Sequence, residues 1–112
     1  MTPEEKFDNL SAAFMHDPDV SLPEEGKGIG SRGLRRGGKN FAMLTRGRVV
    51  VKLPSPRVDS LVKSGDGARF DGNKGRPMRE WFTLDPASTL DWESLAREAL
   101  DFVSTDQSGN RR

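Results

Sequence analysis

Residues 33–53, GLRRGGKNFAMLTRGRVVVKL, decide the fold, because two tight-turn signals divide them into short apolar runs. Gly37-Gly38 and Arg46-Gly47 are two-residue loops of the kind that closes antiparallel hairpins. The pattern therefore predicts three consecutive strands, over about residues 30–36, 39–45 and 48–53.

Two-residue loops also set the pairing of these strands, since partners are counted outward from each loop. The count places Met43 opposite Val50, Leu34 opposite Phe41 and Arg36 opposite Lys39. Cross-strand partners share a face, so the core face is expected to hold Ala42, Leu44, Val49, Val51 and Leu53. The opposite face then holds Leu34, Phe41, Met43 and Val50, bordered by Arg32, Arg36, Lys39, Arg48 and Lys52. A register slip of one residue would exchange the two faces.

The same stretch resembles a phosphate-binding loop, with Gly33, Gly38 and Lys39 at the required spacing. Asn40 stands where the motif needs Ser or Thr to hold Mg²⁺, and a strand pattern follows where the loop should open a helix. A G-x-G-x-x-G match over residues 28–33 also lacks a preceding strand and a following helix. We therefore predict hairpin turns here and no nucleotide cofactor.

Helices are expected on both sides of the three strands. Thr2-Pro3 begins the first helix with a capping box, and Asp17-Pro18 ends it. Residues 17–30 read as a connection, Ser55-Pro56 starts a second helix that ends near Gly65, and a third begins near residue 88 or 89. Two more strands are expected at about residues 68–71 and 76–84. The predicted order is α-β-β-β-α-β-β-α, an α+β fold of two layers whose helices pack on one face of a mostly antiparallel sheet. We expect a single domain over residues 1–104 and a disordered tail over residues 105–112.

Charge is unevenly distributed, although the 112-residue chain has a net charge of only +1. Residues 1–26 carry −6, residues 27–79 carry +11 and residues 80–106 carry −6. Either the acidic ends fold beside the basic middle and neutralise it, or the middle forms a basic patch for an anionic partner. The chain has no cysteine and no apolar run that could span a bilayer, which favours a cytoplasmic protein.

Few residues suggest catalysis or metal binding. His16 is the only histidine, and a chain without cysteine and with one histidine cannot build a usual zinc site. We expect no enzymatic activity, no metal and no membrane contact. Trp81 is predicted to lie on the sheet face that does not carry Phe82. There it is either packed over the sheet edge or exposed to a partner. The candidate partner-binding residues are Arg32, Arg36, Lys39, Phe41, Met43, Arg48, Val50, Lys52 and Trp81.

These residues suit two kinds of partner. Phe, Met and Arg are enriched at protein interfaces and at self-association surfaces. Aromatic and basic residues on one sheet face are also typical of single-strand nucleic-acid platforms. Because Phe41 is the one aromatic residue on the face as predicted from the hairpins, the sequence favours a protein partner over nucleic acid.

Several ordered segments resemble the TfoX N-terminal domain family, over about residues 7–103. They are GSRGL (30–34), GKNFAML (38–44), VVKLP (50–54), GRPMREW (75–81) and the late apolar positions Trp92, Leu95, Ala99, Phe102 and Val103. The resemblance implies a two-layer α+β domain with a central antiparallel sheet. It also implies a regulatory role, because the family includes a competence regulator that acts in transcriptional activation and not as an enzyme. Ile29 departs from the Phe that the family commonly has, and the chain is expected to be a stand-alone N-terminal domain.

Overall fold

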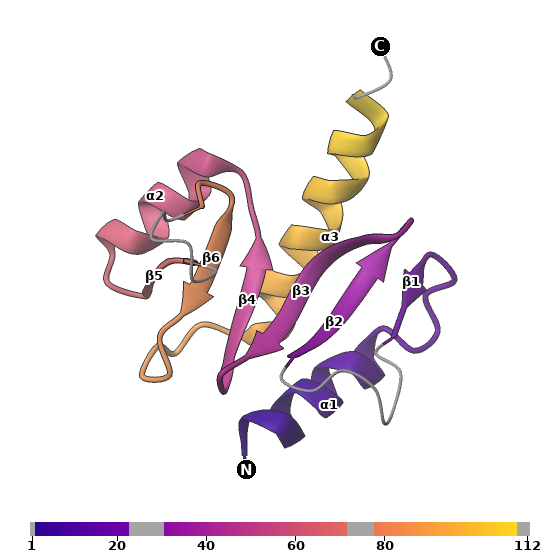
Figure 1. Ribbon diagram of the computed structural model, residues 1–112, viewed down its shortest axis with the longest axis horizontal. Coiled ribbons are helices and arrows are strands. Elements are labelled where there is room, and N and C mark those ends of the chain that lie inside the picture. Colours follow the sequence, from indigo (N-terminus) through magenta and orange to yellow (C-terminus); the bar gives the residue numbers. More distant parts are fainter. Residues whose placement is uncertain (1, 23–30, 72–77, 110–112) are drawn as a thin grey trace.

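The computed structural model describes residues 2–22, 31–71 and 78–109, with the side chains of residues 31, 32 and 105–109 outside that description. The fold is α+β, as predicted (Figure 1). Its elements are α1 (Pro3–Ala13), β1 (Val20–Ser21), β2 (Ser31–Arg36), β3 (Lys39–Thr45), β4 (Arg48–Lys52), α2 (Ser55–Lys63), β5 (Gly67–Arg69), β6 (Trp81–Leu84) and α3 (Trp92–Gly109). The strands form one antiparallel sheet in the order β1-β2-β3-β4-β6-β5.

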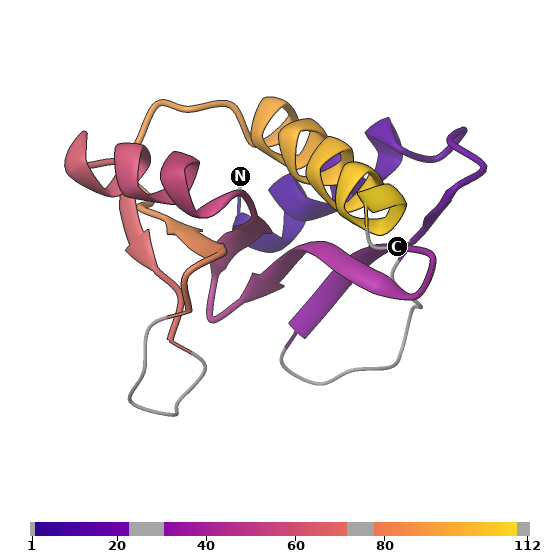
Figure 2. The ribbon, with the colours of Figure 1, turned by 90° about the horizontal axis from the view of Figure 1, so that it is seen from above.

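All three helices pack on the same side of this sheet, as predicted (Figure 2). Their apolar stripes meet the sheet in one core, to which α1 contributes Phe7 and Leu10 and its C-cap residue contributes the Phe14 ring. The remaining core side chains come from the strands and the other helices: Leu34, Phe41, Ala42, Leu44, Val49, Val51, Leu53, Val58, Leu61, Phe82, Leu84, Leu95, Ala96, Ala99 and Val103. One face of the sheet is therefore covered by helices, and the other is the helix-free face.

Local signals explain where α1 begins. Thr2 Oγ1 accepts a hydrogen bond from the Glu5 N–H (3.1 Å), and Glu5 Oε1 accepts one from the Thr2 N–H (2.9 Å). This is the capping box predicted from the sequence, and Pro3 occupies the first helical position. The helix ends at Ala13, one turn before the predicted end at Asp17.

The β3–β4 hairpin has the predicted register, with Met43 opposite Val50 and Leu44 opposite Val49. The β2–β3 hairpin does not keep the predicted register along its length. Arg36 pairs with Lys39 as expected, but Leu34 pairs with Ala42 and not with Phe41, because a β-bulge interrupts the ladder.

The bulge changes which side chains face the core. Phe41 is the extra residue between the pairs of Asn40 and Ala42, and a bulge redirects such a residue out of the normal alternation. Phe41 and Leu34 are both fully buried in the core, where the Phe41 ring meets the Phe14 ring edge to face at 5.7 Å. The predicted position of both residues on the opposite face is therefore wrong.

Other boundaries also differ from the prediction. β1 lies inside the predicted connection, and α3 begins at Trp92 because Asp91, not Ser88 or Thr89, accepts the capping hydrogen bond from the Ser94 N–H (2.9 Å). Helix α3 continues to Gly109, into the predicted tail, of which residues 110–112 lie outside the described part. Of the strand predicted over 76–84, β6 covers the last four residues, while 72–77 lie outside the description, as do residues 23–30 with most of the glycine motif at 28–33.

Candidate binding surface

Charge is separated between the two layers of the fold. Within the described residues, the six strands contain seven basic residues and no acidic residue, whereas the three helices contain eight acidic and four basic residues. The basic strand residues are Arg32, Arg35, Arg36, Lys39, Arg48, Lys52 and Arg69. The basic middle of the sequence is thus concentrated in the sheet, and the acidic ends in the helices above it.

The acidic layer neutralises basic residues on its own side of the sheet. Arg69 of β5 pairs with Asp59 of α2, and Arg36 of β2 has Asp19 at 4.0 Å. Arg36 also lines a hollow of about 310 Å³ together with acidic residues from the turn after α1 and from α3, among them Asp17 and Asp101. Asp19 belongs to the acidic N-terminal segment, so the contact with Arg36 agrees with the interpretation that the acidic ends fold beside the basic middle, whereas Asp59 lies within the middle itself.

Strand register defines the helix-free face. Across it run the rows Met43–Val50–Thr83 and Lys52–Trp81, and the pairs Thr45–Arg48 and Arg35–Asn40. Because side chains alternate along a strand, these residues lie opposite the core. Within the described residues, no acidic side chain forms an ion pair with Arg48 or Lys52, in contrast to Arg36 and Arg69.

Five of the nine candidate residues lie on this face, namely Met43, Arg48, Val50, Lys52 and Trp81. Val50 is nevertheless fully buried at its centre, so its predicted role as an apolar contact is wrong. Met43, Lys52 and Trp81 are half-buried, and Arg48 is exposed.

Of the other four candidates, three are placed elsewhere, and the side chain of Arg32 lies outside the described part. Phe41 belongs to the core, so its predicted partner contact is wrong. Arg36 belongs to the helix-covered side, and Lys39 is its cross-strand partner at the hairpin end. The backbone of Arg32 pairs with Leu44, a core residue, where the predicted register had placed it opposite Met43. The bulge accounts for this change in the backbone pairing of Arg32.

The same bulge brings two residues to this face that the sequence did not indicate. Arg35 Nε donates a hydrogen bond to Asn40 Oδ1 at 3.1 Å. Gly33 leaves the room for this pair, since a Cβ there would lie 2.6 Å from Asn40 Oδ1. The run Phe41-Ala42-Met43-Leu44 is apolar throughout, so no break in alternation reveals the bulge in the sequence.

Lys52 and Trp81 form the central feature of the face. They are cross-strand partners on β4 and β6, and Lys52 Nζ lies 5.9 Å from the centroid of the Trp81 ring. This distance is at the outer limit of a cation–π contact. The Phe70 N–H donates to the Trp81 carbonyl at 2.8 Å, which continues the β5–β6 register and places Phe70 opposite Trp81.

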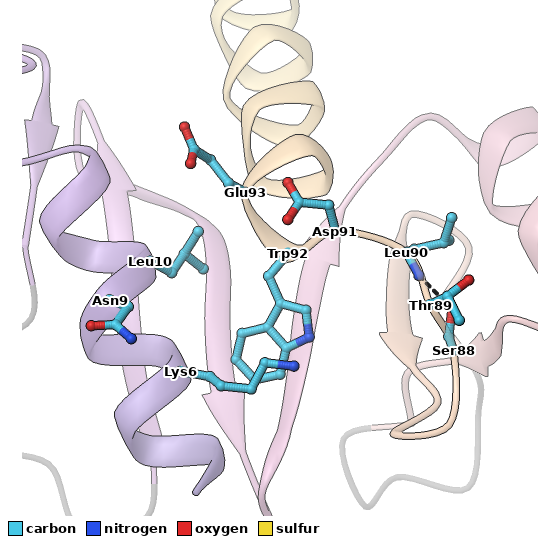
Figure 3. A pocket seen from close by; sticks show the side chains of 9 residues that line it. All are labelled: Lys6, Asn9, Leu10, Ser88, Thr89, Leu90, Asp91, Trp92 and Glu93. Carbon is cyan, nitrogen blue, oxygen red and sulfur yellow. Dashed lines mark hydrogen bonds between the residues drawn. The ribbon is translucent and has the colours of Figure 1, made fainter. Parts of the chain in front are cut away.

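A separate hollow of about 470 Å³ lies between α1 and the segment before α3 (Figure 3). Lys6 reaches over the Trp92 ring there, with Nζ 4.5 Å from its centroid. Polar groups that line the hollow already form local hydrogen bonds. Asp91 accepts hydrogen bonds from the Ser94 N–H and hydroxyl, and the Ser88 hydroxyl accepts one from the Leu90 N–H. This hollow therefore consists of helix-capping and turn residues around a cation–π pair.

The described residues include no group of three or more His, Cys, Asp or Glu side chains that could hold a metal ion. None of the helices in the described ranges is long and apolar enough to cross a bilayer.

Comparison of the chain with protein-family models, with curated proteins and with solved structures finds no match.

Proposed function

We propose that this chain is a non-enzymatic interaction module that binds an anionic macromolecule on the helix-free face of its sheet. The observation that carries the proposal is the separation of charge, with a sheet free of acidic residues beneath an acidic helical layer. The exposed cations of such a face attract anions over a distance, while the acidic residues nearest in the chain, Asp71 and Glu80, adjoin Phe70 and Trp81 at one end of it.

Burial changes which contacts the face offers. Two of the three apolar contacts expected from the sequence, Phe41 and Val50, are fully buried, and only Met43 keeps partial exposure. Apolar anchors dominate the energy of most protein interfaces. The remaining surface is better suited to charge complementarity, through Arg35, Arg48 and Lys52, than to an apolar protein interface.

The resemblance to the TfoX N-terminal domain family supports the same proposal. A family that includes a transcriptional regulator is expected to act through binding partners. A cytoplasmic regulatory role in transcription, exercised by contact with an anionic partner, is therefore our proposal for this chain.

The test compares two charge reversals on opposite sides of the sheet. Arg48→Glu changes an exposed residue of the helix-free face, and Lys63→Glu changes an exposed residue at the end of α2, with the same effect on net charge. Binding of fluorescein-labelled heparin is measured by anisotropy. We expect Arg48→Glu to weaken binding several-fold and Lys63→Glu to leave it nearly unchanged. Equal loss in both variants, or no heparin binding by the unmodified chain, contradicts the proposal.

A further inference from the structure

The inference rests on the proposed function and names the partner. We propose that the helix-free face binds single-stranded nucleic acid, with a base stacked on Trp81 and the phosphates held by Arg35, Arg48 and Lys52. A single strand exposes both the charged backbone and the flat faces of its bases. The face offers a complement to each.

Trp81 supplies the stacking surface. It is half-buried, so the sheet holds the indole in place while part of the side chain remains accessible. The Lys52 ammonium lies over the ring, 5.9 Å from its centroid, so a base that stacks on this face takes the place of the ammonium and leaves it free to meet a phosphate. Phe70 lies opposite Trp81 in the continued β5–β6 register and is also half-buried, which adds a second aromatic residue at this end of the sheet.

The cations are spread over the length of the face. Arg48 and Lys52 lie four residues apart on the same side of β4, or about 13 Å at the rise of an extended strand. Arg35 lies two strands away on β2, about 10 Å across the sheet. Its hydrogen bond to Asn40 uses Nε, and a guanidinium carries further N–H donors for a phosphate. A strand of a few nucleotides is enough to meet all three cations.

The alternatives fit the same surface less well. A duplex keeps its bases inside the stack, so Trp81 would gain no base contact from it. An acidic protein would satisfy the cations but would find the apolar anchors Phe41 and Val50 buried. The single strand is the anion that uses the aromatic and the basic residues together.

The experiment follows Trp81 emission in a Trp92→Phe background, where Trp81 is the only tryptophan. Circular dichroism first establishes that this variant is folded. The probes are a dodecamer of deoxythymidine, a 12-base-pair duplex, polyglutamate and heparin. We expect the dodecamer to quench Trp81 emission and to bind more tightly than the duplex at equal phosphate. Three neutralised phosphates predict a slope of about −2 for log K against log salt, at about 0.7 for each phosphate.

Two substitutions separate stacking from charge. Trp81→Ala should weaken dodecamer binding by about 5- to 150-fold, the range that base–aromatic stacking spans, and leave heparin binding nearly unchanged. Trp81→Leu keeps apolar volume without a ring, so it should show the same selective loss even if the alanine variant folds poorly.

The outcomes distinguish this inference from the proposed function. One outcome is heparin binding that depends on Arg48, while the dodecamer leaves Trp81 emission unchanged and binds no more tightly than the duplex. That result supports the proposed function and overturns the nucleic-acid partner. Tighter binding to polyglutamate than to the dodecamer overturns it in favour of an acidic protein. Failure to bind any of the polyanions overturns both.

Discussion

The two faces of the sheet are made by the same strands and have opposite properties. In β4, Val49 and Val51 point into the core, while Arg48 and Lys52 lie on the helix-free face. The core face is closed by three helices, of which α1 and α3 are acidic, and its basic neighbours Arg36 and Arg69 have acidic partners. Acidic segments thus neutralise the basic residues that they cover and leave the other face of the sheet positive.

The largest effect should come from the residue that the bulge moves between the faces. Phe41→Ala removes a fully buried ring that packs against Phe14, and a buried Phe→Ala change costs about 3–5 kcal/mol. Met43→Ala, two residues further along β3 and half-buried on the other face, is the matched control and should cost clearly less. Urea denaturation followed by circular dichroism measures both. Equal losses would mean that Phe41 does not belong to the core.

A smaller loss is expected where β5 approaches β6. A Cβ on Gly67 would lie 2.1 Å from the Thr83 carbonyl oxygen and 2.6 Å from the Phe82 ring, so Gly67→Ala forces the strands apart. We expect a cost of about 1–3 kcal/mol from overpacking. Ala68→Ser, at the exposed neighbouring position, is the control. A thermal melt that shows no difference between the two variants would contradict the close packing of this edge.

A gain in stability is expected within the helical layer. The Ser11 hydroxyl of α1 is buried and has no hydrogen-bond partner among the described residues. Because an unsatisfied buried polar group is costly and alanine is the better helix former, Ser11→Ala should stabilise the fold by about 1 kcal/mol. The reverse change at the exposed neighbour, Ala12→Ser, should cost a few tenths of a kcal/mol. A loss of stability in Ser11→Ala would show that the hydroxyl has a partner.

The smallest effect depends on pH and concerns the carboxylate of Asp66, after α2 on the helix-covered side. Hydrogen bonds donated by the Ser64 and Ser88 hydroxyls hold the pKa of Asp66 below its ordinary value of 3.8. A lowered pKa in the folded state contributes stability above the unfolded value, and this contribution disappears as pH falls through the folded pKa.

Replacing one donor exposes this contribution. Ser88→Ala should therefore be less stable than the unmodified chain near neutral pH, and the difference should shrink below about pH 3.8. The difference is measured from the urea midpoints of both proteins near neutral pH and below about pH 3.8. A difference that grows in acid would reverse the assigned sign.

Much of the fold follows from local signals that are visible in the sequence. The capping box at Thr2 and Glu5, the turns at residues 37–38 and 46–47, and the apolar stripe of α3 each act over a few residues. The candidate surface was predicted less well, because its membership depends on register along whole strands. The sequence placed Lys52 and Trp81 on the correct face, because side chains alternate regularly in β4 and β6. It did not place Arg35 and Asn40 there, because the bulge changes the alternation.

Local patterns in the sequence were enough to predict the order of the elements apart from β1, the β3–β4 register and the concentration of positive charge in residues 27–79. Packing between distant segments, by contrast, places Phe41 and Leu34 in the core and brings Arg36 to acidic residues. The bulge is stabilised because it lets the Phe41 ring pack against Phe14 and the helices. That contact joins residues far apart in the chain, and no local pattern records it.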